Sequence, residues 1–156
     1  MDISEKFMKK ALAQARVAYR KNETPIGAVI VKDGKVIARA HNRRETGKNA
    51  LYHAEILAIN KACKKLGGWR LFECDMYVTL EPCLMCAGAI VQSRIRNLYF
   101  GAYDKKGGGV GSLVDIPSLE GVTQKVNTRG GILEEECSSL LKDFFKNLRK
   151  TKTAND

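Results

Sequence analysis

The chain has 156 residues, of which 44% are hydrophobic and 28% charged, and its formal net charge is +10. This length fits one domain of roughly 100–200 residues, and the apolar share excludes a disordered chain. We expect a cytoplasmic protein, because no apolar run approaches the roughly 20 residues that cross a bilayer and the charged start of the chain lacks the apolar core of a secretory signal. The positive charge favours nucleic acid as a partner, although it can also serve solubility alone.

Local patterns predict four helices and five strands. In chain order, they are a helix over 5–20, strands over 26–31 and 36–40, a helix over 53–65, a strand over 76–80, a helix over 83–93, a strand over 98–101, a weaker strand over 122–127 and a helix over 133–149. Ser4 is the expected N-cap of the first helix, and Asp33-Gly34 is typical of a tight hairpin. The helix over 83–93 is apolar nearly all round, which predicts burial under its own sheet or against a second subunit.

The order of these elements predicts the fold class. Strands that alternate with helices after an initial hairpin indicate an α/β fold. We expect a three-layer α/β/α sandwich with a mixed central sheet of about five strands. Residues 1–150 should form a single domain, since the sequence contains no internal repeat or linker, and the polar residues 151–156 should form a frayed tail.

A histidine and two cysteines have the spacing of a metal site. The chain has five cysteines, an odd number that disfavours a disulfide framework in a cytosolic protein. Cys83 and Cys86 form a Cys-x-x-Cys pair at the predicted start of a helix, where the helix dipole favours thiolates. With His53 they supply the three protein ligands that a catalytic zinc keeps beside an open position, so we predict one Zn²⁺ per subunit. The other cysteines are interpreted as core residues or bystanders: Cys63, Cys74 and Cys137.

Glu55, two residues after His53, suits proton transfer rather than metal ligation. It is poorly placed to reach the same ion from the same helical turn, but it can lie over a water at the ion's open position. Zinc lowers the pKa of such a water toward about 7, and a carboxylate there can carry a proton to a ring nitrogen and then to a leaving amine. Hydrolytic deamination requires these transfers.

The separate parts of this pattern are weak signals, and their combination is a strong one. A lone His-x-Glu is common by chance, a lone histidine is more often a core residue, and a lone Cys-x-x-Cys can be a redox pair. Here His53-Ala54-Glu55 is followed, after a helix and a strand, by Pro82-Cys83-Leu84-Met85-Cys86. That combination is typical of zinc-dependent nucleobase deaminases, and we expect such an enzyme.

The chain resembles the bacterial tRNA-specific adenosine deaminases, within the cytidine-deaminase-like superfamily, from about residue 7 to residue 149. The resemblance is carried by Thr24-Pro25-Ile26-Gly27-Ala28-Val29, His53-Ala54-Glu55-Ile56, the run from Tyr77 to Ile90, Ser93-Arg94-Ile95 and Phe144-Phe145-Lys146. It implies a homodimer that converts adenosine to inosine at the wobble position of a tRNA anticodon loop.

The resemblance also assigns residues to the substrate. It implies that Asn42 contacts the flipped nucleoside, that the backbone amide of Ala54 meets the base, and that Ile26 packs on it. Contacts to the tRNA anticodon stem-loop are implied for Arg70, Asp104, Lys106, Phe145 and Arg149. Because Phe144 and Phe145 are adjacent, they cannot both face the core squarely, and we expect one to be exposed. The basic residues of this helix can also be an ordinary solvated face.

Two residues depart from the family's pattern, and two other functions stay open. Tyr52 stands before His53, where relatives usually have a small residue, and there it can restrict the mouth of the pocket or add a stacking surface. Tyr103 fills a position that is often charged. The first alternative function is deamination of a free nucleobase or nucleoside, of guanine or cytosine type. The second is a non-catalytic, zinc-stabilised RNA-binding subunit, which the presence of Glu55 disfavours.

Overall fold

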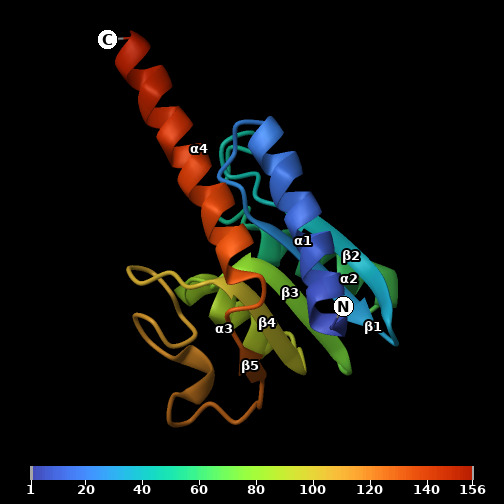
Figure 1. The fold of residues 1–156 in the computed structure, drawn as a ribbon. Coiled ribbons are helices and arrows are strands. Elements are labelled where there is room, and N and C mark those ends of the chain that lie inside the picture. Colours follow the sequence, from blue (N-terminus) through green and yellow to red (C-terminus); the bar gives the residue numbers. More distant parts are fainter. Residues whose placement is uncertain (1, 156) are drawn as a thin grey trace.

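The computed structural model of the protein describes the backbone of residues 2–155 and the side chains of residues 2–151. Its elements are α1 (Ile3–Arg20), β1 (Gly27–Lys32), β2 (Lys35–His41), α2 (Ala54–Leu66), β3 (Cys74–Leu80), α3 (Leu84–Gln92), β4 (Asn97–Ala102), η1 (Ile116–Ser118), β5 (Asn127–Arg129) and α4 (Glu134–Asn155). One five-stranded sheet has α1 and α4 on one face and α2 and α3 on the other (Figure 1). The expected three-layer α/β/α sandwich is confirmed.

The sheet is mixed, and its strand order brings several strand ends to one edge. The order is β2-β1-β3-β4-β5. β1 pairs antiparallel with both β2 and β3, whereas β3 with β4 and β4 with β5 are parallel. The first residue of β1, Gly27, therefore lies opposite His41 at the end of β2, and Leu80 lies opposite Ala102 at the ends of β3 and β4. Residues just outside these strand ends meet at the same edge.

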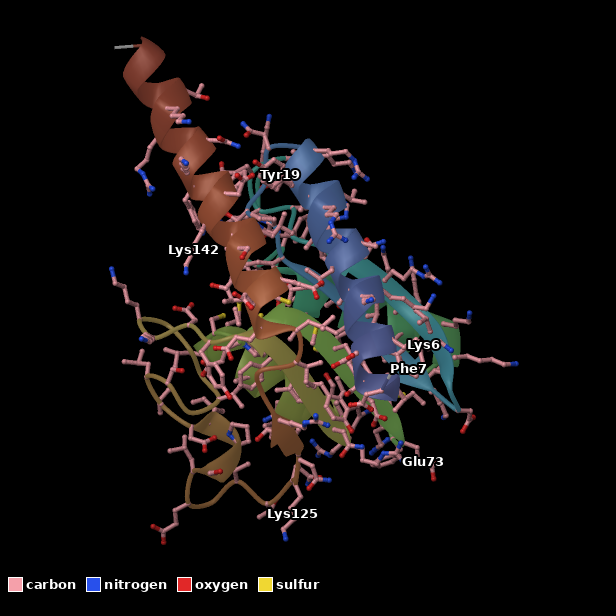
Figure 2. All side chains as sticks on the ribbon, in the orientation of Figure 1. Lys6, Phe7, Tyr19, Glu73, Lys125 and Lys142 are labelled. Carbon is pink, nitrogen blue, oxygen red and sulfur yellow. The ribbon has the colours of Figure 1, made fainter. Side chains whose placement is uncertain are left out.

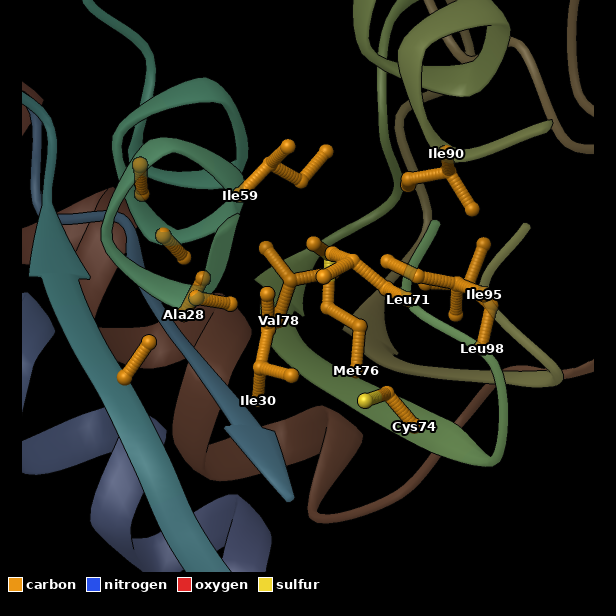
Figure 3. Packing of buried hydrophobic residues seen from close by; sticks show 14 of the residues in the cluster. Ala28, Ile30, Ile59, Leu71, Cys74, Met76, Val78, Ile90, Ile95 and Leu98 are labelled. Carbon is orange, nitrogen blue, oxygen red and sulfur yellow. The ribbon is translucent and has the colours of Figure 1, made fainter. Parts of the chain in front are cut away.

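Two apolar clusters, one on each face of the sheet, hold the layers together. Ile30, Met76 and Leu98 of the sheet belong to the same buried cluster as Ile59 of α2 and Ile90 of α3 (Figure 3). The cluster on the opposite face includes Phe7, Met8, Leu12, Val29, Tyr77 and Cys137. Each large apolar side chain buried in this way stabilises the fold by about 1.5–3 kcal/mol relative to exposure.

α1 begins at Ile3, earlier than expected, because Asp2 rather than Ser4 caps it. Asp2 has an extended backbone conformation, and its carboxylate accepts hydrogen bonds from the Ser4 backbone N–H at 3.4 Å and from the Ser4 hydroxyl at 2.6 Å. The acceptor that an N-cap supplies is thus the carboxylate, while Ser4 lies buried in the first turn. The expectation that Ser4 caps this helix is wrong.

The last strand and the last helix also differ from expectation. β5 comprises Asn127–Arg129 rather than residues 122–127, because the chain meets the edge of the sheet only there: the Asn127 N–H donates to the carbonyl of Arg96 at 3.0 Å. α4 continues to Asn155 and extends past the body of the domain (Figure 1). Most of the segment 151–156 therefore continues the helix, residue 156 lies outside the described residues, and the domain boundary at residue 150 stays a prediction.

α3 is buried on one side only, although its sequence is apolar nearly all round. Its buried residues are Cys86, Ala87, Ile90 and Val91. Leu84, in contrast, is 51% exposed. Despite such apolar segments, no helix within residues 2–155 is both long and apolar enough to pass through a lipid bilayer.

α1 crosses β1 at Gly27 so closely that a methyl group has no room there. A Cβ at this position would lie 2.1 Å from the carbonyl oxygen of Ala11 and 2.5 Å from the backbone nitrogen of Ala15. Gly27→Ala should therefore push α1 off the sheet and lower the free energy of unfolding by about 1–3 kcal/mol, as measured by chemical denaturation. Gly68→Ala is the control, since a Cβ there meets no atom within 4 Å. Equal stability of the two variants would contradict this packing.

Candidate active site

A partly enclosed pocket lies at the sheet edge where the strand ends meet. Its walls come from the segment before β1, the end of β2, the first turn of α2, the ends of β3 and β4, and the start of α3. The lining residues include Ile26, Asn42, His53, Ala54, Glu55, Glu81, Cys83 and Asp104. The topology thus gathers into one space residues that are far apart in the sequence.

His53, Cys83 and Cys86 form a group that fits one metal ion. The Nδ1 atom of His53 lies 3.6 Å from the Sγ atom of Cys83 and 3.5 Å from that of Cys86, and the three ligand atoms all lie within 4.8 Å of one another. A tetrahedral zinc ion, with Zn–N of about 2.0 Å and Zn–S of about 2.3 Å, separates such atoms by about 3.5 Å. Both distances match this value, so the imidazole and the two sulfur atoms suit a shared ion.

Two helix starts place these ligands. His53 is the N-cap of α2 and Cys83 is the N-cap of α3, and both have extended backbone conformations. Neither side chain makes a capping hydrogen bond to its own helix. Each can therefore point toward the start of the other helix and contribute to a shared metal site. Cys86 lies in the first turn of α3, three residues after Cys83, which brings its sulfur atom to the same side of the helix.

The ligand group favours the charged form of one thiol. The hydrogen bond from Cys86 lowers the pKa of the Cys83 thiol to about 4 in spite of burial, and the hydrogen bond with His53 lowers it further. The hydrogen bond with Cys83, together with burial, raises the pKa of Cys86. The hydrogen bond with Cys83 also raises the pKa of His53. Cys83 is therefore the natural thiolate of the pair, the form in which a cysteine binds a metal.

Glu55 lies beside the ligand group, in the first turn of α2, and is 4% exposed. Burial raises the pKa of its carboxyl to about 7, against a smaller opposing effect of a backbone hydrogen bond. A carboxyl group with a pKa near neutrality can both accept and donate a proton. The position and the pKa of Glu55 thus suit the proton transfer expected from the sequence.

The three residues expected to contact the substrate all line the pocket. Ala54 is fully buried at the start of α2, and Asn42 is 6% exposed just after β2. The side-chain amide of Asn42 donates to the carbonyl of Thr24 at 3.3 Å, and its Oδ1 atom accepts from the N–H of Arg44 at 3.1 Å. These bonds fix the Asn42 side chain next to Ile26 and the ligand group.

Of the five residues expected to contact RNA, only Asp104 lines this pocket within the described part of the chain. Lys106 lies exposed in the loop after β4. The guanidinium of Arg70 stacks on the exposed ring of Trp69, 4.1 Å from its centroid. The other two lie on the exposed side of α4: Phe145 and Arg149.

The two adjacent phenylalanines of α4 differ as expected. Phe144 is 6% exposed and its ring meets that of Tyr19 of α1 edge to face. Phe145, in contrast, is 41% exposed. The prediction that one of the pair faces solvent is therefore confirmed, and the buried one joins α4 to α1.

Tyr52 does not line the pocket, although it directly precedes His53. Its ring packs on Gly47, where an added Cβ would lie 2.4 Å from a ring carbon. Its carbonyl accepts a hydrogen bond from the N–H of Arg43 at 3.0 Å. The tyrosine therefore packs within the loop between β2 and α2, and the expectation that it restricts the pocket or adds a stacking surface there has no support in this geometry.

Sequence reasoning missed the role of Glu81, a 2% exposed carboxylate between β3 and Cys83. Glu81 lines the pocket and accepts hydrogen bonds from the loop that follows β4. A charged residue after a buried apolar strand and before a proline was the available signal. Its partners lie more than 20 residues away, however, and no local pattern identifies them.

Similarity to known proteins decides the family. The MafB19-like deaminase family matches residues 2–149. The tRNA-specific adenosine deaminase of Bacillus subtilis (strain 168) is 50% identical over 154 residues, which cover 99% of this chain and 96% of that protein. The chain belongs to the tRNA-specific adenosine deaminase family. Its membership agrees with the arrangement of His53, Cys83 and Cys86.

Solved structures extend the comparison. One from a study of A-to-I editing by tRNA:A34 deaminases at the wobble position of transfer RNA is 48% identical to this deaminase, with a TM-score of 0.84 over 86% of this chain and 97% of that chain. The guanine deaminase of Nitrosomonas europaea is 26% identical, with a TM-score of 0.76 over 90% of this chain and 83% of that chain. This deaminase therefore shares its fold with enzymes of both kinds and more of its sequence with the first.

Replacement of one thiol tests whether the three-residue group binds a metal ion. Cys86→Ser removes a sulfur ligand from the group, and we expect the purified protein to lose most of its bound divalent metal, measured by elemental analysis after dialysis. Cys63→Ser is the control, because Cys63 lies outside the ligand group. A Cys86→Ser protein that keeps one ion per chain would exclude this ligand set.

Proposed function

We propose that this deaminase hydrolyses adenosine to inosine at the wobble position of a tRNA anticodon loop, with one Zn²⁺ per subunit held by His53, Cys83 and Cys86. The observation that carries the proposal is the three-ligand group with the buried Glu55 beside it. The name of its 50% identical relative supports adenosine in tRNA as the substrate. The overall reaction consumes one water and releases one ammonia.

The proposed mechanism assigns the proton transfers to Glu55. When bound, the zinc ion supplies Lewis acidity that makes hydroxide available from water near neutral pH. The Glu55 carboxylate takes a proton from the attacking water and delivers it to N1 of the purine as the oxygen adds to C6. Glu55 then takes the proton of the new C6 hydroxyl and delivers it to the amino group, so that the C6–N bond breaks, the C6 carbonyl of inosine forms and ammonia leaves. A pKa near 7 suits a group that gains and loses a proton in each turnover.

The pocket residues orient the base in this proposal. Ile26 packs on the purine, the backbone amide of Ala54 donates to the base, and Asn42 contacts the nucleoside. Their common position around the ligand group supports these roles. The hydrogen bonds of Asn42 to Thr24 and Arg44 hold its side chain in place before the substrate arrives, which reduces the entropy lost on binding.

The surface around the pocket binds the anticodon stem-loop. The contacts assigned to it are Arg70, Asp104, Lys106, Phe145 and Arg149. The net charge of +10 supports a polyanionic substrate. The exposed aromatic ring of Phe145 offers a stacking surface for a base that leaves the loop. We place this activity in the cytoplasm, where tRNA is modified in bacteria.

The proposed assembly is a homodimer. Its support is a set of exposed apolar side chains on α3, on the segment before β3 and on the loops that flank η1. Those side chains are Leu84, Trp69, Phe72, Leu113 and Leu119. Exposed apolar groups of this kind are typical of subunit interfaces.

Deamination of a nucleobase outside RNA is the second candidate. The TM-score of 0.76 with a guanine deaminase favours this candidate, because one set of metal ligands can serve the deamination of either a free base or an adenosine in RNA. A non-catalytic RNA-binding subunit is disfavoured, since such a protein has no use for a buried Glu55 beside the ligand group.

The substrate test compares a short anticodon stem-loop RNA, with adenosine at the wobble position, against free adenosine, guanine and cytidine. We expect inosine in the RNA and little turnover of the free compounds. Glu55→Ala should keep its zinc and its RNA affinity but lose about 10²–10⁴-fold in rate. Turnover of free guanine with inert RNA would select the second candidate, and an active Glu55→Ala enzyme would remove the role given to this carboxylate.

The oligomeric state tests the proposed interface. Leu84→Glu places a charge on the exposed side of α3 and should convert dimers to monomers in sedimentation equilibrium. Ile3→Glu makes the same change at another exposed apolar residue, on α1 at the opposite face of the sheet, and should leave the dimer intact. A wild-type protein that sediments as a monomer would exclude this assembly.

A further inference from the structure

Glu81 joins the metal-ligand segment to a distant loop. It directly follows β3, precedes Cys83 by two residues, and is 2% exposed. A carboxylate in such a position is tolerated where hydrogen-bond donors surround it. The donors come from residues 104–112, which we call the 104–112 loop.

Each oxygen of this carboxylate accepts two hydrogen bonds. Oε1 accepts from the N–H of Asp104 at 3.1 Å and from the hydroxyl of Ser112. Oε2 accepts from the N–H groups of Val110 and Ser112, each at 3.1 Å. One side chain thus holds the beginning and the end of the loop.

Two glycines let the loop approach Glu81 and the residues that follow it. A Cβ at Gly108 would lie 2.3 Å from the carboxyl carbon of Glu81, and a Cβ at Gly109 would lie 2.8 Å from the carbonyl oxygen of Cys83. The N–H of Gly109 donates to the carbonyl of Pro82 at 2.7 Å, and Gly108 forms an isolated β-bridge with Cys83. The loop is therefore packed directly against a metal ligand.

The loop carries Asp104 into the pocket. The Oδ1 atom of Asp104 accepts hydrogen bonds from the N–H of Lys106 at 3.3 Å and from that of Gly107 at 3.1 Å. The position of the backbone at Lys106 thus follows from that of Asp104, and the position of Asp104 follows from its hydrogen bond to Glu81.

We propose that Glu81 is a positioning residue that fixes the 104–112 loop against Cys83 and thereby determines the preference for adenosine held in RNA over free adenosine. This inference rests on the proposed function. Asp104 and Lys106 occupy positions assigned to RNA contact, and a loop that is already ordered loses less entropy on binding. Free adenosine does not extend beyond the pocket to Lys106, which lies exposed outside it, and therefore gains less from that order.

Glu81→Gln keeps the shape of the side chain and changes one oxygen to a donor. The amide nitrogen of the glutamine should take the place of Oε1. There the Ser112 hydroxyl can rotate and accept a hydrogen bond from it, whereas the two backbone N–H groups at Oε2 can only donate. The variant therefore keeps the hydrogen bonds of Val110 and Ser112 N–H and releases the N–H of Asp104. Glu73→Gln is the control: Glu73 is exposed at the other end of β3, far from the loop (Figure 2).

Two measurements test the role of Glu81. We expect hydrogen exchange at the Asp104 amide to become faster in Glu81→Gln while zinc content is unchanged. We expect KM for the stem-loop RNA to rise about tenfold or more, the size of effect of one lost hydrogen bond to a charged group, with kcat changed less than about twofold. The much lower kcat/KM for free adenosine, measured at high enzyme concentration, should fall less than that for the RNA. Unchanged exchange, or equal loss with both substrates, would overturn the proposal.

A double-mutant cycle shows whether Glu81 acts through Asp104. Asp104→Ala combined with Glu81→Gln should raise KM for RNA no further than Asp104→Ala alone, and additive effects would contradict this coupling.

If Glu81→Gln does not fold, Ser112→Ala removes one hydrogen bond to Oε1 and should raise KM for RNA in the same direction by less; no change would count against the proposal. Failure of the proposed function appears instead as inert wild-type enzyme on RNA, while the hydrogen-exchange result still tests the loop.

Discussion

β1, the second of the five strands in the sheet, pairs antiparallel with β2 on one side and with β3 on the other, and the site depends on this pairing. It brings the start of β1 to the same edge as the ends of β2 and β3, so Ile26, Asn42 and Glu81 border one space. α2 and α3 present their N-termini to that space. Their free N–H groups and positive dipole ends favour thiolates and carboxylates there. His53 and Cys83 occupy the N-cap positions of these two helices.

Two buried carboxylates each hold a loop that contributes a residue to the pocket lining. Glu81 binds the loop after β4, and Glu23 binds the loop after β2 through the N–H groups of Glu45 and Thr46 and the Thr46 hydroxyl. Burial by itself raises the pKa of Glu23, but the hydrogen bonds from Thr46 and Glu45 outweigh it, and the pKa lies below its usual value. Buried charge that is fully hydrogen-bonded in this manner rigidifies a loop and specifies its conformation.

Local spacing was enough to predict most elements and the group formed by His53, Cys83 and Cys86, whereas long-range contacts were not predictable. His53, Glu55 and the Cys83–Cys86 pair follow from short motifs, because helix starts orient residues that are close in sequence. The N-cap of α1 was misassigned because Asp2 and Ser4 are both good caps and only their mutual hydrogen bond decides. β5 depends on where a long loop meets β4, and the conformation of Tyr52 depends on Gly47. The hydrogen bonds of Glu81 join segments that no local pattern relates.

The glycines at 108 and 109 give the loop after β4 the composition of a flexible linker, yet both lie against other atoms. These glycines are needed because the loop backbone passes close to Glu81 and Cys83, and they do not indicate a mobile loop. The consequence concerns which positions tolerate change in directed evolution. Lys105 and Lys106 have exposed side chains, so a library that varies them alters the surface offered to a ligand while the loop keeps its path. Variation at Gly108 or Gly109 would instead displace the loop and the cysteine behind it, and would mostly yield inactive protein.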